Sequence, residues 1–122
     1  MSLSNTVENE MLTDFLTRHP VLYLALSTAD PGEAGASIAE PVGNGYARQL
    51  IPAVTISGNL LLNDDAVVFP MATGNQGTLT HSALFSAVTG GTFLGSGIFT
   101  STPCPVGTVI IIPQDTAIVS LD

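Results

Sequence analysis

The stretch Val-Leu-Tyr-Leu-Ala-Leu-Ser at residues 21–27 decides the fold class. Leu22, Leu24 and Leu26 occupy alternate positions, so a β-strand would place these leucines on one side and Tyr23 on the other. Pro20 stands directly before the stretch and disfavours a helical conformation for the residue that precedes it. We therefore predict a strand over residues 21–27 and the end of any upstream helix at Pro20.

Upstream of Pro20 the residues have the spacing of a helix. Asn5 can act as the N-cap, and Glu8 three positions later completes a capping-box pattern. Arg18 near the end suits the negative pole of the helix dipole. We predict one helix within the segment 1–19, which covers a face or an edge of a sheet with Val7, Met11, Leu12, Phe15 and Leu16.

Downstream of residue 27 a long turn-rich stretch occupies residues 28–45. Its turns are marked by Pro31, Gly32, Gly35, Pro41 and Gly43. A connection of this length is unusual in a compact domain and indicates a functional or contact loop. The sequence therefore predicts a long contact loop at residues 28–45.

The rest of the chain consists of short apolar runs between turn residues. Gly95 and Gly97, inside one of these runs, indicate a bulge or a close backbone approach. A hairpin is expected to turn at residues 57–59. Strands are predicted over residues 46–51, 54–56, 60–62, 67–69, 77–85, 93–99, 109–112 and 117–121. Short strands at this spacing predict a mainly β fold: an antiparallel, jelly-roll-like β-sandwich with a short N-terminal α-helix, forming one domain over residues 1–122.

The charge content is the unusual feature of the composition. Charged residues make up 10% of the chain, against roughly 25% in a typical soluble domain, and the formal net charge is −8 with only two Lys or Arg. Phosphate binding depends on basic side chains, so we expect no nucleic acid and no anionic membrane surface as partners. We also expect no signal peptide, because no basic and then apolar region opens the chain. A weakly charged surface favours a partner that covers part of it, and we expect self-association.

Few residues suit catalysis or metal binding. We interpret His19 as a helix-end residue, His81 as a hydrogen-bonded strand histidine on the face of Leu79, and Cys104 as a small buried side chain. No nucleophile motif or zinc spacing accompanies them, so we expect no catalytic residue, metal ligand or cofactor site, and no enzymatic activity. Calcium is the alternative for the acidic pairs Asp30/Glu33 and Asp64/Asp65, which we interpret as turn chemistry.

Arg48 is one of only two cations in an acidic chain. An arginine in a strand normally finds a carboxylate, and Glu40 or Glu33 in the preceding loop could supply one. We predict a structural clamp between Arg48 and one of these carboxylates that fixes the loop. A contact with a neighbouring subunit is the alternative role.

Several blocks of the sequence resemble a family of small tailed-phage structural proteins, known as tail-fibre-like or capsid decoration proteins. The most specific blocks are Thr-Ala-Asp-Pro-Gly-Glu-Ala-Gly at residues 28–35 and Gly-Tyr-Ala-Arg at residues 45–48. Weaker blocks lie at residues 2–12, 22–27, 40–41, 69–73, 77–85, 89–91 and 119–122. The chain departs from the family pattern at Asn75-Gln76, where an aromatic residue usually stands. The resemblance implies a virion component without enzymatic activity.

Our leading functional interpretation is a capsid cement protein that stabilises the outer surface of the head as a homo-oligomer, with a homotrimer expected by analogy. The major capsid protein would be its partner, and the segment through Arg18 and the loop from Thr28 to Gly45 its contacts. The alternative is a distal tail-fibre or receptor-binding module that contacts host surface polysaccharide. Either role places the protein on the outside of the virion after assembly in the host cytoplasm.

Overall fold

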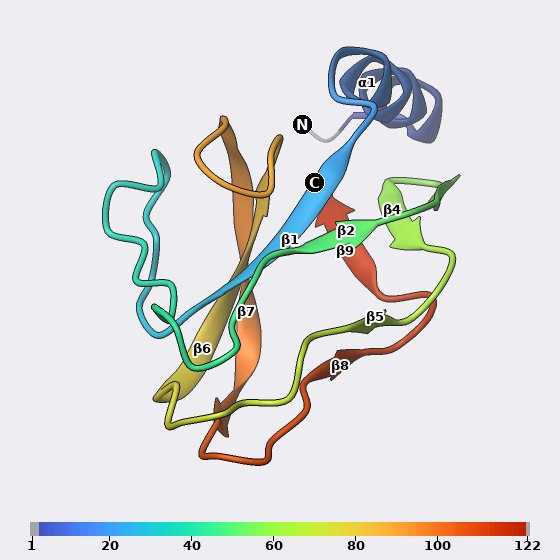
Figure 1. Ribbon diagram of the computed structural model, residues 1–122. Coiled ribbons are helices and arrows are strands. Elements are labelled where there is room, and N and C mark those ends of the chain that lie inside the picture. The colour runs from blue at the N-terminus through green and yellow to red at the C-terminus, as the bar shows by residue number, and fades with distance from the viewer. Residues whose placement is uncertain (1–2, 122) are drawn as a thin grey trace.

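The computed structural model describes residues 3–121, which form one helix and nine strands (Figure 1). Met1, Ser2 and Asp122, which belong to the expected domain and to two of the family blocks, lie outside the described residues. The helix and strands are α1 (Asn5–Arg18), β1 (Leu22–Ser27), β2 (Gln49–Ile51), β3 (Val54–Ser57), β4 (Leu60–Asn63), β5 (Val67–Val68), β6 (Thr78–Phe85), β7 (Phe93–Pro103), β8 (Ile111–Ile112) and β9 (Ala117–Ser120).

The largest sheet has the antiparallel order β2-β1-β6-β7, with the leucine-rich strand β1 near its centre. Leu22 pairs with Ile51 in β2, and Leu24 pairs with Leu84 in β6. Directly opposed residues share a face of a sheet, so these apolar side chains lie on one side of it. The alternation of leucines in β1 therefore sets the buried face of the whole sheet.

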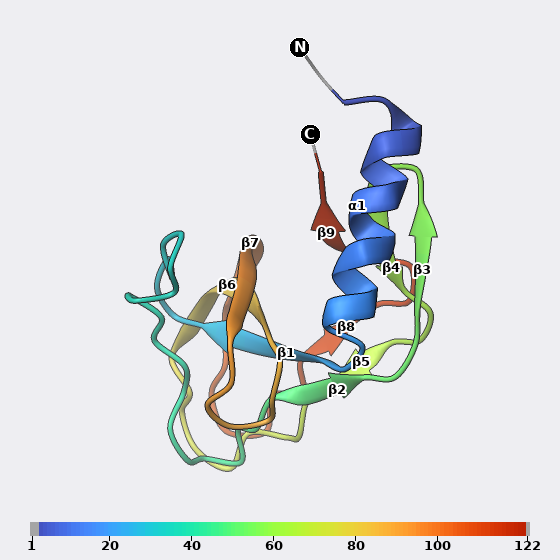
Figure 2. The same ribbon diagram turned by 90° about the horizontal axis from the view of Figure 1, so that it is seen from above.

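The smaller sheets are β3-β4-β9 and the two-stranded pair β5-β8. The predicted hairpin is confirmed: Val54 pairs with Asn63 and Ser57 with Leu60 around Gly58. In the view of Figure 2, β3, β4, β9 and α1 stand together on one side of the molecule, while β6 and β7 stand on the other. The mainly β, antiparallel and sandwich-like fold with an N-terminal helix is thus confirmed, and the jelly-roll topology stays a prediction.

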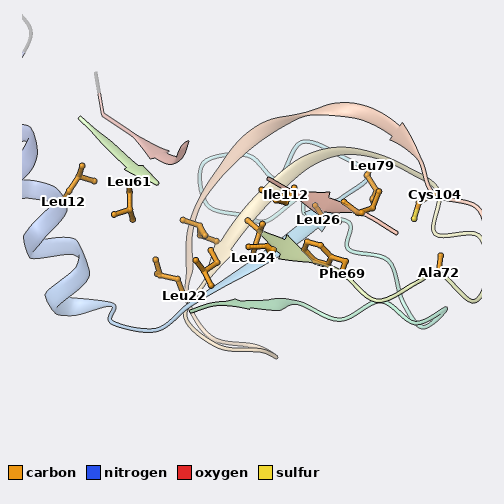
Figure 3. Packing of buried hydrophobic residues seen from close by; sticks show 14 residues of the cluster. Leu12, Leu22, Leu24, Leu26, Leu61, Phe69, Ala72, Leu79, Cys104 and Ile112 are labelled. Carbon is orange, nitrogen blue, oxygen red and sulfur yellow. The ribbon is translucent and has the colours of Figure 1, made fainter. Parts of the chain in front are cut away.

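The main core lies between the sheets and under α1. Leu12 of α1 and Leu61 of β4 are 1% and 0% exposed and lie beside each other in Figure 3. The buried leucines of β1 join this core, as the sequence predicted. Burying each leucine contributes about 2 kcal/mol by the transfer of apolar surface from water.

The helix differs from the prediction at its start and on its buried face. Ser4, not Asn5, is the N-cap, because its side-chain oxygen accepts a hydrogen bond from the amide of Val7 at 3.2 Å. Val7 and Met11 are exposed, and Glu8 takes part in the buried face with Leu12. This face of the helix packs towards β3, and Leu12 lies beside Leu61 of β4 (Figure 3).

Several strand boundaries also differ from the prediction, among them those of β2 and β7. Residues 46–48 are not strand, because the side chains of Tyr46 and Arg48 fasten this segment instead, and β2 begins at Gln49. Strand β7 continues past Phe99 to Pro103. The expected bulge is present beside Gly95: Leu84 pairs with Gly95 and Phe85 with Phe93, which leaves Leu94 as the extra residue.

Candidate functional site

The segment between β1 and β2 is a long loop with a narrow neck, and we call residues 28–48 the anchored loop. At the neck the amide of Thr28 donates to the carbonyl of Ala39 at 3.0 Å. The hydroxyl of Ser27 accepts from the amides of Ala29 and Ala39 at 3.2 and 3.0 Å. These bonds close residues 28–39, the first part of the anchored loop, into a compact surface unit rather than an extended linker.

The first half of the anchored loop is a turn built by the family block at residues 28–35. The carboxylate of Asp30 accepts from the amide of Gly32 at 2.9 Å, and Pro31 is fully buried. Gly35 has φ +73, and a Cβ there would lie 2.6 Å from the ring of Phe93. Asp30 therefore acts in a turn, as predicted, and Gly35 is required for the loop to approach β7 closely.

The second half of the anchored loop is fastened by Arg48. Its guanidinium makes two hydrogen bonds with the carboxylate of Glu40, Nε to Oε1 at 2.9 Å and Nη2 to Oε2 at 2.8 Å. The two side chains are 10% and 21% exposed. This paired geometry is the strongest form of an Arg–carboxylate contact. The predicted clamp is thus confirmed with Glu40, whereas Glu33 lies exposed in the turn.

Arg48 also ties the anchored loop to the turn between β6 and β7. Its Nη1 donates to the carbonyls of Ala87 and Gly90 at 3.0 and 2.8 Å. Its Cζ lies 3.6 Å from the centre of the Phe85 ring, a cation–π distance. One side chain therefore joins the loop, the sheet and the β6–β7 turn.

Tyr46 is the third member of the clamp, and the sequence did not single it out for this role. Its hydroxyl donates to Glu40 at 2.7 Å and accepts from the amide of Leu26 at 3.0 Å. Its ring is stacked on that of Phe69, with centroids 6.3 Å apart. The spacing Tyr-x-Arg after an acidic residue is the only sequence signal that could have found it.

The clamp changes the acid–base properties of its members. Burial works against ionisation of Glu40, but the hydrogen bonds from Arg48 and Tyr46 outweigh it and lower the pKa of Glu40 below its usual value. Burial and the hydrogen bond to Glu40 raise the pKa of Tyr46. The hydrogen bonds with Glu40 likewise raise the pKa of Arg48. The cluster therefore holds a fixed ion pair and a neutral phenol at neutral pH.

Outside the clamp, the anchored loop presents an apolar surface. Val42 is 91% exposed at the tip of the loop, and Val88 in the facing turn is 49% exposed. The two border a groove of about 440 Å³ whose wall includes Glu40, Tyr46 and Arg48. On the sheet side, Ile38 of the loop packs on Ala83 and Phe85. The exposed valines are thus carried on a fixed base, which suits a binding surface.

The other residues considered in the sequence have local roles. Cys104 is buried, and its thiol donates to the side-chain oxygen Oε1 of Gln76 at 3.3 Å. Burial raises the pKa of this thiol. His19 ends α1, with its ring 5.2 Å from that of Phe15. Gln76, at the position where the family pattern has an aromatic residue, is buried and donates to the carbonyl of Asn44.

One placement differs from the sequence prediction. His81 does contact a hydroxyl, with Nδ1 2.9 Å from Thr80 Oγ1, but it does not share the face of Leu79. The pairing of β6 with β7 shifts register between Leu79 and His81. Leu79 consequently belongs to the main core, while His81 pairs with Ser27 and Ile98 on the opposite side of the sheet.

The second acidic pair also has a local partner, since the Asp64 carboxylate accepts from the hydroxyl of Thr55. Among residues 3–121, no three His, Cys, Asp or Glu side chains gather in a group that could hold a metal ion. Within the same range, no helix combines the length and the apolar character needed to cross a bilayer.

Fold and loop together define a small β-rich protein with an exposed apolar loop held in place by the Arg48 clamp. The chain belongs to the family described as podophage GP4 fiber I protein gp80, whose model matches residues 2–119. It is therefore a tailed-phage structural protein of the fibre-like type, as the sequence blocks indicated, and it is associated with the virion. A comparison with curated proteins found no match.

Proposed function

We propose that this protein is a non-catalytic subunit of the outer surface of the virion, which binds its neighbour through the anchored loop. The observation that carries the proposal is the Arg48 clamp, which holds Val42 and its neighbours in one conformation before any partner arrives. A surface ordered in advance loses less entropy on binding. This is the property that a subunit acting only by attachment needs.

Two positions on the particle have support. The family description names a fibre protein, which favours a place in the tail-fibre assembly, with host surface polysaccharide as a further contact. The structure supports capsid cement on the head: its one described helix spans 14 residues, and no long helix for a fibre shaft is present among residues 3–121. We place the fibre assembly first and the cement role, with the major capsid protein as partner, second.

The test uses purified protein and particles of a phage that lacks it. Restored binding is measured by sedimentation, on intact particles and on separated heads and tails. Binding to tails supports the fibre role, and saturable binding to heads supports the cement role. Binding to neither would contradict the proposal.

A matched pair of variants tests the anchored loop itself. Val42→Glu places a charge at the loop tip, where the side chain is 91% exposed, and should weaken binding about tenfold or more because the new charge is desolvated. Val106→Glu, at a position 69% exposed and outside the groove that Val42 and Val88 border, is the control and should bind like the unmodified protein. Equal binding by both variants would show that the loop is not the contact.

A further inference from the structure

Strand β7 is an edge strand that carries no charged side chain. Among residues 3–121 it is the longest strand, Phe93–Pro103, and β6 alone pairs with it. Proteins commonly protect such an edge with charged side chains, yet no Asp, Glu, Lys or Arg occurs anywhere in residues 66–114. Between its two register shifts, residues 95–98 form a regular ladder with β6, and Ile98 is 91% exposed there.

An apolar cleft of about 400 Å³ runs beside this edge. Its walls come from β1, β6 and β7 on one side and from α1, β8 and β9 on the other, and they include Phe15, Leu84, Phe99 and Ile118. Strand β9 is itself the edge of its sheet. In Figure 2, β7 and β9 stand next to each other near the middle of the molecule, and residues of both strands line the cleft. The cleft therefore lies between the edge strands of two sheets.

Glycines in β7 keep the cleft open. Gly95 and Gly97 pair with Leu84 and Ser82, whose partners on β1, Leu24 and Leu26, belong to the main core. A Cβ at Gly95 would meet nothing within 4 Å, and at Gly97 it would meet only the Ser82 hydroxyl at 3.6 Å. Neither glycine has a positive φ, so the backbone does not require glycine at either position. The absence of side chains at these two positions therefore leaves the cleft open and is not required by the backbone conformation.

The distribution of charge favours a second copy of this chain over a basic partner as the occupant of the cleft. The chain has a net charge of −8, and two such chains repel each other wherever their acidic residues approach. The cleft and β7 carry no ionisable carboxylate or basic side chain. A basic partner would instead be attracted to the acidic parts of the chain. The uncharged edge of β7 is thus the surface to which an equally acidic copy can bind without charge repulsion.

We propose that a second copy of this chain docks on β7, adds a strand to the edge of the large sheet and inserts apolar side chains into the cleft before Gly95. Strand addition satisfies the unpaired backbone groups of β7, and the cleft provides apolar burial. The proposal rests on the proposed function as a virion subunit, and it assigns the self-association expected from the sequence to one surface.

The first experiment measures the mass of the purified full-length protein across a dilution series by native mass spectrometry and light scattering. The unmodified chain should form an oligomer of the 12.5 kDa subunit. Ile98→Glu should raise the dissociation constant about tenfold or more through charge repulsion and desolvation. Val106→Glu adds the same charge outside the cleft and should associate like the unmodified protein.

A second variant tests the cleft without adding charge. Gly95→Leu fills the space before Leu84 and should also weaken association, whereas Val106→Leu, at an exposed position outside the cleft, should not. Circular dichroism checks that each variant is folded. If Gly95→Leu does not fold, the comparison of Ile98→Glu with Val106→Glu alone decides whether β7 is the interface.

The outcomes separate this inference from the proposed function. An unmodified protein that is monomeric at every concentration, or variants that all associate normally, would overturn the β7 interface. Particle binding is measured independently, so monomers that still bind the particle would refute only the interface. Loss of particle binding with intact self-association would refute only the proposed attachment.

Discussion

The anchored loop and strand β7 differ in how far their contacts are satisfied within the chain. The loop contains no strand over residues 28–48, yet the side chains of Glu40, Tyr46 and Arg48 fix it. Strand β7 is fully regular over residues 95–98, yet in the part of the chain that the structure describes no strand pairs with its outer edge. The comparison shows that side-chain contacts can fix a segment without secondary structure, whereas a regular strand can leave the hydrogen-bonding groups of one edge unpaired.

The largest test of this contrast removes the cation of the clamp. Arg48→Met leaves Glu40 without its partner and should lower the free energy of unfolding by about 3 kcal/mol. Hydrogen exchange at the amide of Thr28 should rise, while the β6–β7 ladder beyond residue 94 keeps its protection. Urea unfolding and exchange measured by NMR give both results.

Arg18→Ala is the matched control, because Arg18 pairs with Asp14 at 3.0 Å on the exposed face of α1. A surface pair of this kind is worth less than about 0.5 kcal/mol. Equal losses in the two variants would show that the Arg48 clamp does not hold the loop.

A smaller effect is expected for Tyr46→Phe. The change leaves the amide of Leu26 without its acceptor and removes one donor to Glu40, at a cost of about 2 kcal/mol. Tyr23→Phe is the control, on the other face of β1, and should change stability by much less. An unchanged melting temperature for Tyr46→Phe would mean that the ring, and not the hydroxyl, does the fastening.

Two glycines of the loop allow strain and contact to be separated. Gly32 and Gly35 both have a positive φ, +75 and +73, but only at Gly35 does an added Cβ meet a side chain. Both alanine variants should lose about 1 kcal/mol to strain, and Gly35→Ala about 1 kcal/mol more from the contact with Phe93. Thermal unfolding measures the difference, and equal losses would place the loop further from β7 than the structure has it.

Acid should loosen the two regions unequally. The pKa of Glu40 is lowered in the folded state, so its contribution to stability is complete above the ordinary value of 4.5 and is lost as the pH falls through the folded value. Exchange in the anchored loop should therefore increase at acidic pH, and less so in Glu40→Gln. The β7 region, without carboxylates in residues 66–114, should show no matching change.

The sequence predicted what depends on local pattern. The alternation in residues 21–27, the hairpin at Gly58 and the Arg48–Glu40 pair follow from spacing and from the scarcity of cations. It did not predict Tyr46 in the clamp or the opposite faces of Leu79 and His81, because tertiary hydrogen bonding and a register shift determine them. Gly95 was expected to mark a bulge, but the cleft depends on β9, far along the chain.

A cryo-electron microscopy map of the intact particle tests the central claim most directly, because it shows the surroundings of every copy at once. The account predicts that the anchored loop faces another virion protein and that β7 lies against a second copy of this chain. A map in which the loop faces solvent and β7 has no neighbouring copy would contradict it.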